Sequence, residues 1–321
     1  MRSYFRQLLL EKRRQQLLKA GKWVPWKLPK LPAWSYPMNV ERRYSVQIQR
    51  TMREFALVSA AWVRDNLPRL IQAQASRHHT DHQDGVNDDL IPYRGAFHEV
   101  QVSQFGSQAT GYTAKILQFG TEVANYSKKQ WAKIMGAVLG HEYYPAEPWL
   151  QEVTQEWADG NHQLIKSLSD EYITKSNLLL QEGILSGQQY PQLTADLLKL
   201  NKNLTVNRAK LIATDQVGKL NGRLAMHRQL DAGLSLYTWE TAGDERVRQI
   251  HRSLDHQICK WSDSTVYRLA GVWLPRTGNM DRSTPGQPIR CRCIGLPFFE
   301  PMLQDIDQEL SEDPELANLS Q

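Results

Sequence analysis

The sequence predicts an α+β protein in which a mostly helical N-terminal region precedes a compact α+β C-terminal module. Apolar residues recur at three- or four-residue spacing through much of residues 39–200, which is the period of a helix that buries one face. Beyond these helices the pattern changes, because residues 236–241 (LYTWET) alternate as a strand does and short aromatic and proline-containing pieces follow. We expect four segments: a basic arm (1–38), a helical domain (39–200), an α+β domain (201–299) and an acidic tail (300–321).

The two ends of the chain carry opposite charge. Residues 1–30 hold nine lysines or arginines against one acid, whereas residues 300–321 hold seven acids and no base, within a net charge of +5 for all 321 residues. A basic segment attracts polyanions or acidic protein surfaces, and an acidic one repels nucleic acid. We therefore expect any contact with DNA at the N-terminal end.

Composition excludes several classes of protein. No apolar run approaches the roughly 20 residues of a membrane span, and the apolar patch Leu8–Leu10 is followed directly by charges, unlike a secretory signal. Three cysteines, an odd number, argue against a disulfide framework and favour a reducing compartment. We expect a cytoplasmic protein with no membrane partner, no small-molecule substrate and no cofactor.

The arm is expected to meet a partner. A short basic amphipathic helix fits residues 3–20, and four prolines between residues 25 and 37 then favour polyproline-like extension. Burying several tryptophans is typical of protein interfaces, so we favour a protein partner, with stacking on DNA as the alternative. The residues expected to contact DNA or a partner are Arg13, Arg14, Lys22, Trp23, Trp26, Lys27 and Lys30.

Helix signals divide residues 39–200. Asn39 is expected to cap a helix that Pro68 ends, and Ser127 opens a capping box (SKKQ) for another. The longest pattern starts at Pro148 and fades near Gly183, and a short helix fits residues 191–200.

A polar loop is predicted over residues 76–89. Its His78, His79, Asp81 and His82 are all of metal-ligand type, but a plain inter-helix loop explains them equally well.

The α+β domain begins with a helix predicted from Thr205 and stopped by Gly233. Asp244 is expected to cap a helix over residues 245–254, and residues 271–275 (GVWLP) read as a strand.

Motifs of this domain occur in a specific order. A helix with Asp215-Gln216 and Lys219-Leu220-Asn221 precedes the Tyr-x-Trp strand, the sequence DERVRQIH (244–251) and, after a proline, CRC (291–293). Over about residues 200–297 this order resembles the Mu F-like minor head proteins, the head morphogenesis proteins of tailed bacteriophages and prophages. The residues that match the family motif are Trp239, Asp244, Arg246, Arg248, His251, Cys291 and Cys293.

One position departs from the family pattern. The family usually places glycine after the Leu254-Asp255 pair, whereas this chain has His256, and histidine tolerates a positive φ less well than glycine.

The resemblance implies a structural, non-enzymatic minor head protein, present in few copies. It implies action with the portal protein and other head proteins in procapsid and head assembly, and a further role in DNA packaging or delivery. The implied location is the host bacterial cytoplasm during assembly and the interior of the virion head afterwards.

The same residues allow an enzymatic alternative. On a helix, Asp244, Arg248 and His251 share one face, so an acid, a cation and a base gather as a nuclease or transferase needs, and Glu240 could join them. A capping and salt-bridge network explains the spacing more simply. The chain also lacks a phosphate-binding glycine loop and a serine nucleophile elbow.

The cysteines leave several interpretations open. Cys291, Cys293 and Cys259 with His251 or His256 would make a zinc site of a zinc-stabilised binding module. A catalytic thiol would instead pair with His251, and a Cys291–Cys293 disulfide would close a small strained ring. We favour small buried side chains on a half-buried strand over residues 289–293, with Arg292 pointing away.

Overall fold

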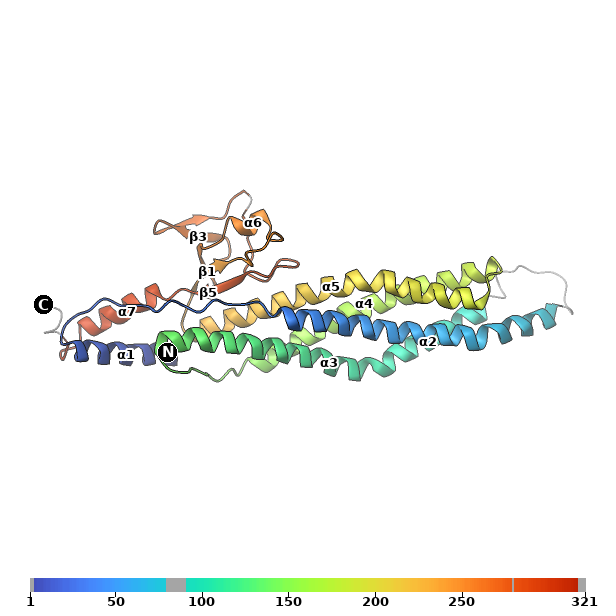
Figure 1. Ribbon diagram of the computed structural model, residues 1–321, viewed down its shortest axis with the longest axis horizontal. Coiled ribbons are helices and arrows are strands. Elements are labelled where there is room, and N and C mark those ends of the chain that lie inside the picture. Colours follow the sequence, from blue (N-terminus) through green and yellow to red (C-terminus); the bar gives the residue numbers. More distant parts are fainter. Residues whose placement is uncertain (1–2, 79–90, 279, 317–321) are drawn as a thin grey trace. The chain divides into compact units, whose positions relative to one another are not determined.

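The computed structural model describes residues 3–78, 91–278 and 280–316 (Figure 1). The histidine-rich loop that sequence offers as a metal site lies, from His79 onward, outside the described residues. The α+β class is confirmed, since helices dominate the first two thirds of the chain and an antiparallel sheet follows. Among the described residues, no helix combines the length and the apolar character that crossing a membrane requires.

The helices that precede the sheet are α1 (Tyr4–Ala20), α2 (Met38–His78), α3 (Ile91–Leu139), α4 (Leu150–Leu185) and α5 (Tyr190–Asp231). The rest of the chain forms β1 (Leu236–Glu240), α6 (Gln249–Arg252), β2 (Ile258–Lys260), β3 (Val266–Leu269), β4 (Val272–Pro275), β5 (Ile294–Pro297) and α7 (Glu300–Ser311).

Two compact units form, and neither is continuous in sequence. The helical unit comprises Asn39–Phe119 and Gln155–Ala213, and the mixed unit comprises Met1–Met38, Gly120–Thr154 and Thr214–Gln321. Both ends of the chain belong to the mixed unit.

A buried polar network runs through the helical unit. The Tyr44 hydroxyl donates to Asn161 Oδ1 at 2.7 Å, and the Gln101 amide donates to the hydroxyls of Ser59 and Ser176 at 3.1 and 2.8 Å. Because buried polar groups are costly unless they are hydrogen-bonded, these contacts favour one alignment of the helices in this unit.

The mixed unit has an apolar core built from both ends of the chain. Phe5 and Leu9 of α1 are fully buried with Trp131 of α3 and Ile306 of α7, and Phe299 packs against Phe5. The short helix predicted over residues 3–20 is confirmed as α1, and residues 23–37 form neither helix nor strand. Tryptophans of this extended stretch pack against the same core, so the chain itself covers much of their surface.

Ion pairs join α1 to α7, which lie side by side in Figure 1 (dark blue and red). Arg6 Nη2 lies 2.8 Å from Glu309 Oε2, Arg13 Nε lies 2.7 Å from Asp307 Oδ1, and Arg14 pairs with Asp313 and Glu315. The opposite charges of the two ends therefore complement each other within one unit.

A second buried ion pair fastens α5 to α3 and to the segment before α4. Arg228 Nε donates to Glu147 Oε1 at 2.6 Å, and its Nη1 donates to Ser127 Oγ at 2.7 Å. The side chains of Arg228 and Glu147 are 0% and 3% exposed, so each neutralises a charge that water cannot reach.

The sheet has the strand order β4-β3-β2-β1-β5 with every neighbouring pair antiparallel. The strands predicted over residues 236–241 and 271–275 are confirmed as β1 and β4. Strand β1 is central to the packing, because Tyr237 and Trp239 on one of its faces are fully buried.

Several predicted helix ends are wrong, because the residues that suggested them serve tertiary packing. Pro68 lies inside α2, where burial of Val63 and Leu67 offsets the hydrogen bond that proline removes. Ser127 lies inside α3 and binds Arg228 instead of capping, and Thr205 is buried within the unbroken α5.

We predict that Arg228→Ala lowers the free energy of unfolding by about 3–5 kcal/mol, because the buried Glu147 carboxylate would keep only the partly exposed Lys128, 3.5 Å away, as its ionic partner. Urea denaturation followed by tryptophan fluorescence measures this change. The control is Lys166→Ala, since the ion pair of Lys166 with Asp170 is solvent-exposed and should contribute less than about 1 kcal/mol. Equal effects of the two substitutions would contradict this account of the buried pair.

Candidate functional site

Four of the matched motif residues come from β1, from α6 and from the loop that precedes β5. Trp239 on β1 is fully buried, and its ring lies 5.7 Å from the ring of His251 on α6. Cys291 and Cys293 sit just before β5 and are 3% and 4% exposed. Sequence order alone separates these residues by about fifty positions, whereas the fold brings their side chains into one buried cluster.

His251 faces both cysteines with the same ring nitrogen. Its Nδ1 lies 3.5 Å from Cys293 Sγ and 3.8 Å from Cys291 Sγ. The three ligand-type atoms all lie within 4.8 Å of one another. We call His251, Cys291 and Cys293 the thiol–imidazole cluster.

Asp281 holds the other side of the His251 ring. Its Oδ2 lies 3.3 Å from His251 Nε2, and its Oδ1 accepts hydrogen bonds from the backbone N–H and the hydroxyl of Ser283. Its backbone N–H also donates to the Ile250 carbonyl at 3.2 Å. Burial raises the pKa of the Asp281 carboxyl, but the hydrogen bonds from His251 and Ser283 prevail and lower it to about 2.

Contacts within the cluster also shift the pKa values of its three side chains. Burial lowers the pKa of His251, yet Asp281 and Cys291 together raise it to about 9. The hydrogen bond from Cys293 and the neighbouring imidazole lower the pKa of Cys291 to about 5 against the effect of burial, while the pKa of Cys293 is raised by Cys291 and by burial. The pKa values of the two thiols are therefore shifted in opposite directions, although both thiols face the same imidazole.

The loop of residues 285–293 reaches this position by lying on the backbone of α5. A Cβ atom at Gly218 would fall 2.3 Å from the Cys291 carbonyl oxygen, and one at Gly222 would fall 2.3 Å from the Pro285 carbonyl oxygen. Only glycine admits such an approach. Asp215 Oδ1 on the same helix accepts a hydrogen bond from the Arg290 backbone N–H at 3.1 Å.

The half-buried strand predicted over residues 289–293 is wrong. Arg290 has φ 60, the Cys291 backbone N–H donates to the Pro288 carbonyl in a turn, and β5 starts only at Ile294. Residues 289–293 alternate between apolar and charged side chains although they form no strand. The turn at Arg290 directs the thiols of Cys291 and Cys293 into the interior. Arg292 points away from them, as expected, and pairs with Asp244 at 2.7 Å.

The predicted helix over residues 245–254 is shorter in the structure. α6 begins at Gln249, with Arg248 at its N-cap, so Asp244, Arg248 and His251 do not lie along one helical face. Asp244 binds Arg246 at 2.9 Å and Arg292 at 2.7 Å, whereas Arg248 donates to the Ile289 carbonyl at 2.7 Å. These contacts are those of a salt-bridge and capping network.

His256, the departure from the family pattern, adopts φ 61. The backbone at this position is therefore in the left-handed region, which favours the glycine that the family usually has there. The exposed His256 ring lies 3.2 Å from Glu240 Oε2, so Glu240 contacts this turn.

Cys259 stands apart from the thiol–imidazole cluster. It is fully buried on β2, opposite Tyr237 of β1, and its thiol lies 3.6 Å from the Gln257 carbonyl oxygen. Burial raises the pKa of its thiol. Of the residues that sequence offers as zinc ligands, the structure brings together His251, Cys291 and Cys293.

The arm residues are divided between interior and surface. Arg13 is fully buried, where it binds Asp307 and the Val24 carbonyl and lies over the ring of Trp26 at 4.7 Å. Arg14 is held by Asp313 and Glu315, and Trp23 and Trp26 are half-buried. Lys22, Lys27 and Lys30 are exposed.

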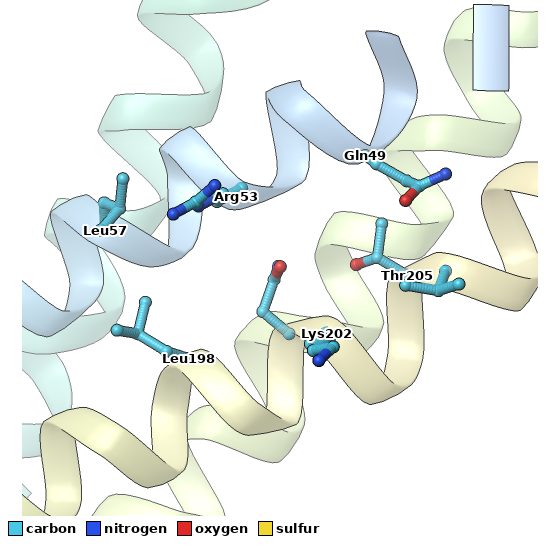
Figure 2. Close-up of a pocket in the computed structure, with 8 residues that line it drawn as sticks. Gln49, Arg53, Leu57, Leu198, Lys202 and Thr205 are labelled. Carbon is cyan, nitrogen blue, oxygen red and sulfur yellow. The ribbon is translucent and has the colours of Figure 1, made fainter. Parts of the chain in front are cut away.

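The helical unit carries a groove of its own between α2 and α5 (Figure 2). It has a volume of about 460 Å³, with Leu57 and Leu198 in its lining and the cations Arg53 and Lys202 beside them. It holds none of the motif residues and no acid that would complete a catalytic or metal centre.

Sequence reasoning missed Asp281 and Arg276. Arg276 is 1% exposed and donates to the carbonyls of Asp281 and Ser283, which fixes the segment that carries the Asp281 carboxylate. Asp281 was recognisable only as an Asp-x-Ser turn, in which the carboxylate binds the backbone two residues on. Nothing local points to its contact with His251, thirty residues earlier.

The sequence model of the family described as "Phage Mu protein F like protein" matches residues 175–295. The matched region ends just beyond the thiol–imidazole cluster and includes every motif residue. The predicted resemblance is confirmed over these residues. The family suggests a phage head morphogenesis protein.

A relative in Haemophilus influenzae, described as an uncharacterized protein, is 29% identical over 201 residues. The matched part covers 62% of this chain and 40% of the relative, so this chain corresponds to less than half of that protein. No solved structure matches the chain.

We predict that Gly218→Ala destabilises the mixed unit by about 1–3 kcal/mol, because the new methyl group meets the Cys291 carbonyl and the loop must move. This loss exceeds the gain of up to about 1 kcal/mol that alanine brings to a helix. The control is Gly160→Ala on α4, where nothing lies within 4 Å and the helix should gain stability. Thermal unfolding followed by circular dichroism compares the two, and a stabilised Gly218→Ala protein would refute the close approach.

Proposed function

We propose that the chain is a structural head protein of a tailed phage or prophage that assembles with the portal and other head proteins. The match of residues 175–295 to the Mu F-like family carries this proposal, because it covers β1 to β4, the start of β5 and all the motif residues. The contacts of the motif residues agree with it. Asp244, Arg246, Arg248 and Arg292 hold loops to one another, as expected of a module whose polar residues serve its shape.

An enzymatic role is less well supported. The acid, base and cation that a nuclease would use have different partners, since Asp244 binds two arginines while His251 binds Asp281 and approaches the thiols. Burial of the thiol–imidazole cluster also keeps a macromolecular substrate from a thiol nucleophile. A role in head assembly requires no reaction at these groups.

The arm offers the contact surface. Lys22, Lys27 and Lys30 lie exposed along one short extended segment, whereas Arg13 and Arg14 are already neutralised by acids of the C-terminal end. Lysines that are free of such pairing attract an acidic protein surface or the DNA backbone. We infer that the arm contributes these lysines to contacts in the head, with the portal protein or with packaged DNA.

We predict that the chain co-sediments with heads in lysates of the induced prophage that encodes it, and that it stays in the soluble fraction when the portal gene is deleted. Sucrose-gradient fractions probed with an antibody measure the distribution. A chain that is soluble in both lysates would overturn the head role. A chain that sediments with heads in both would retain the head role and remove the portal contact.

We predict that the triple substitution Lys22→Glu, Lys27→Glu and Lys30→Glu releases the chain from heads in the same gradient. The control replaces Lys115, Lys199 and Lys210, exposed lysines of the helical unit, by glutamate and should leave the chain bound. Heads that have not packaged DNA distinguish the partner, because contact with packaged DNA is absent from them and contact with protein is kept. If the two triple variants sediment alike, the lysines of the arm do not hold the chain to heads.

A further inference from the structure

We propose that His251, Cys291 and Cys293 bind one zinc ion, which ties α6 to the loop before β5. This inference is independent of the proposed role in the head. It starts from two sulfur atoms that converge on one imidazole nitrogen inside a buried module.

The distances in the cluster are those of ligands around a common ion. Zinc binds sulfur at about 2.3 Å and imidazole nitrogen at about 2.0–2.1 Å, which in a tetrahedron separates sulfur from nitrogen by about 3.5–3.6 Å. The observed separations from His251 Nδ1 are 3.5 Å to Cys293 Sγ and 3.8 Å to Cys291 Sγ. Both separations are close to the tetrahedral value, and all three atoms lie within 4.8 Å of one another.

Hydrogen bonding explains the arrangement less completely. Nδ1 of an imidazole either donates one hydrogen or accepts with one lone pair, so it serves one thiol well and not two. A metal ion satisfies all three atoms at once.

Asp281 supplies the orientation that a ligating histidine needs. When Nε2 of His251 carries the hydrogen and donates it to the Asp281 carboxylate, Nδ1 keeps its lone pair for the metal. Asp281 is itself fixed by the backbone N–H and the hydroxyl of Ser283. A carboxylate behind a histidine ligand is the usual second layer of a zinc site, and here Asp281 is a positioning residue.

The donor set selects the ion. Two thiolates and one imidazole favour zinc over magnesium or calcium, which prefer oxygen ligands. Two thiolates also balance the charge of one Zn²⁺ ion, so the site remains neutral where burial makes net charge costly. Three protein ligands leave a fourth position for a water molecule.

Metal analysis of the purified full-length chain, prepared without a histidine tag, tests the proposal. We expect about one zinc per chain in the wild type. Cys259→Ser, which alters a buried thiol of the same sheet outside the cluster, should retain the zinc, whereas Cys291→Ser and Cys293→Ser should lose it. A wild-type protein that neither contains zinc nor takes it up when zinc is added would overturn the proposal, as would loss of zinc in Cys259→Ser alone.

Two further measurements separate loss of the site from loss of the fold. Cobalt added to the metal-free wild type should give thiolate-to-cobalt charge-transfer absorption, and Cys259→Ser should give the same band. Asp281→Asn keeps all three ligands, so it should keep the band while weakening zinc affinity by roughly 10- to 100-fold. An unchanged affinity in Asp281→Asn would remove Asp281 from the site, and absence of the band in the folded wild type would refute thiolate ligation.

Discussion

The close approach of the loop of residues 285–293 to the backbone of α5 is the constraint on which the mixed unit's chemistry depends. Gly218 and Gly222 leave room for the carbonyl groups of Cys291 and Pro285, so the loop can lie directly on the helix. The turn at Arg290 then directs both thiols toward His251. Without that contact the two cysteines would belong to a surface loop, and neither a buried cluster nor the pairing of Arg292 with Asp244 would follow.

Charge organises the same unit at a larger scale. The basic and acidic ends of the chain pair with each other through α1 and α7, and Arg13 is buried in the process. The opposite charges of the two ends suggest an external partner in the sequence, but part of this charge is neutralised by ion pairs within the unit. Lys19 near the end of α1 and the lysines that follow this helix stay exposed, which is a smaller basic surface than the charge of residues 1–30 suggests.

The sequence predicts the parts of this fold that depend on local signals. Strand β1 follows from the alternation of LYTWET, and the end of α4 follows from the glycines near residue 185. Capping signals mislead at Ser127 because its hydroxyl accepts from Arg228, a contact between residues a hundred positions apart. The sequence likewise predicts only part of the candidate site. His251, Cys291 and Cys293 are recognisable by type, but excluding Cys259 and including Asp281 require the tertiary structure.

Amide hydrogen exchange on the purified full-length chain tests most directly whether the loop and α6 form one locked element on α5. If they do, the amides of residues 249–252 and 291–293 open together, exchange slowly at matching rates and are as protected as those of β1. Fast exchange in residues 291–293 alongside a protected β1 would contradict the account, because it would show a mobile loop on an otherwise intact sheet.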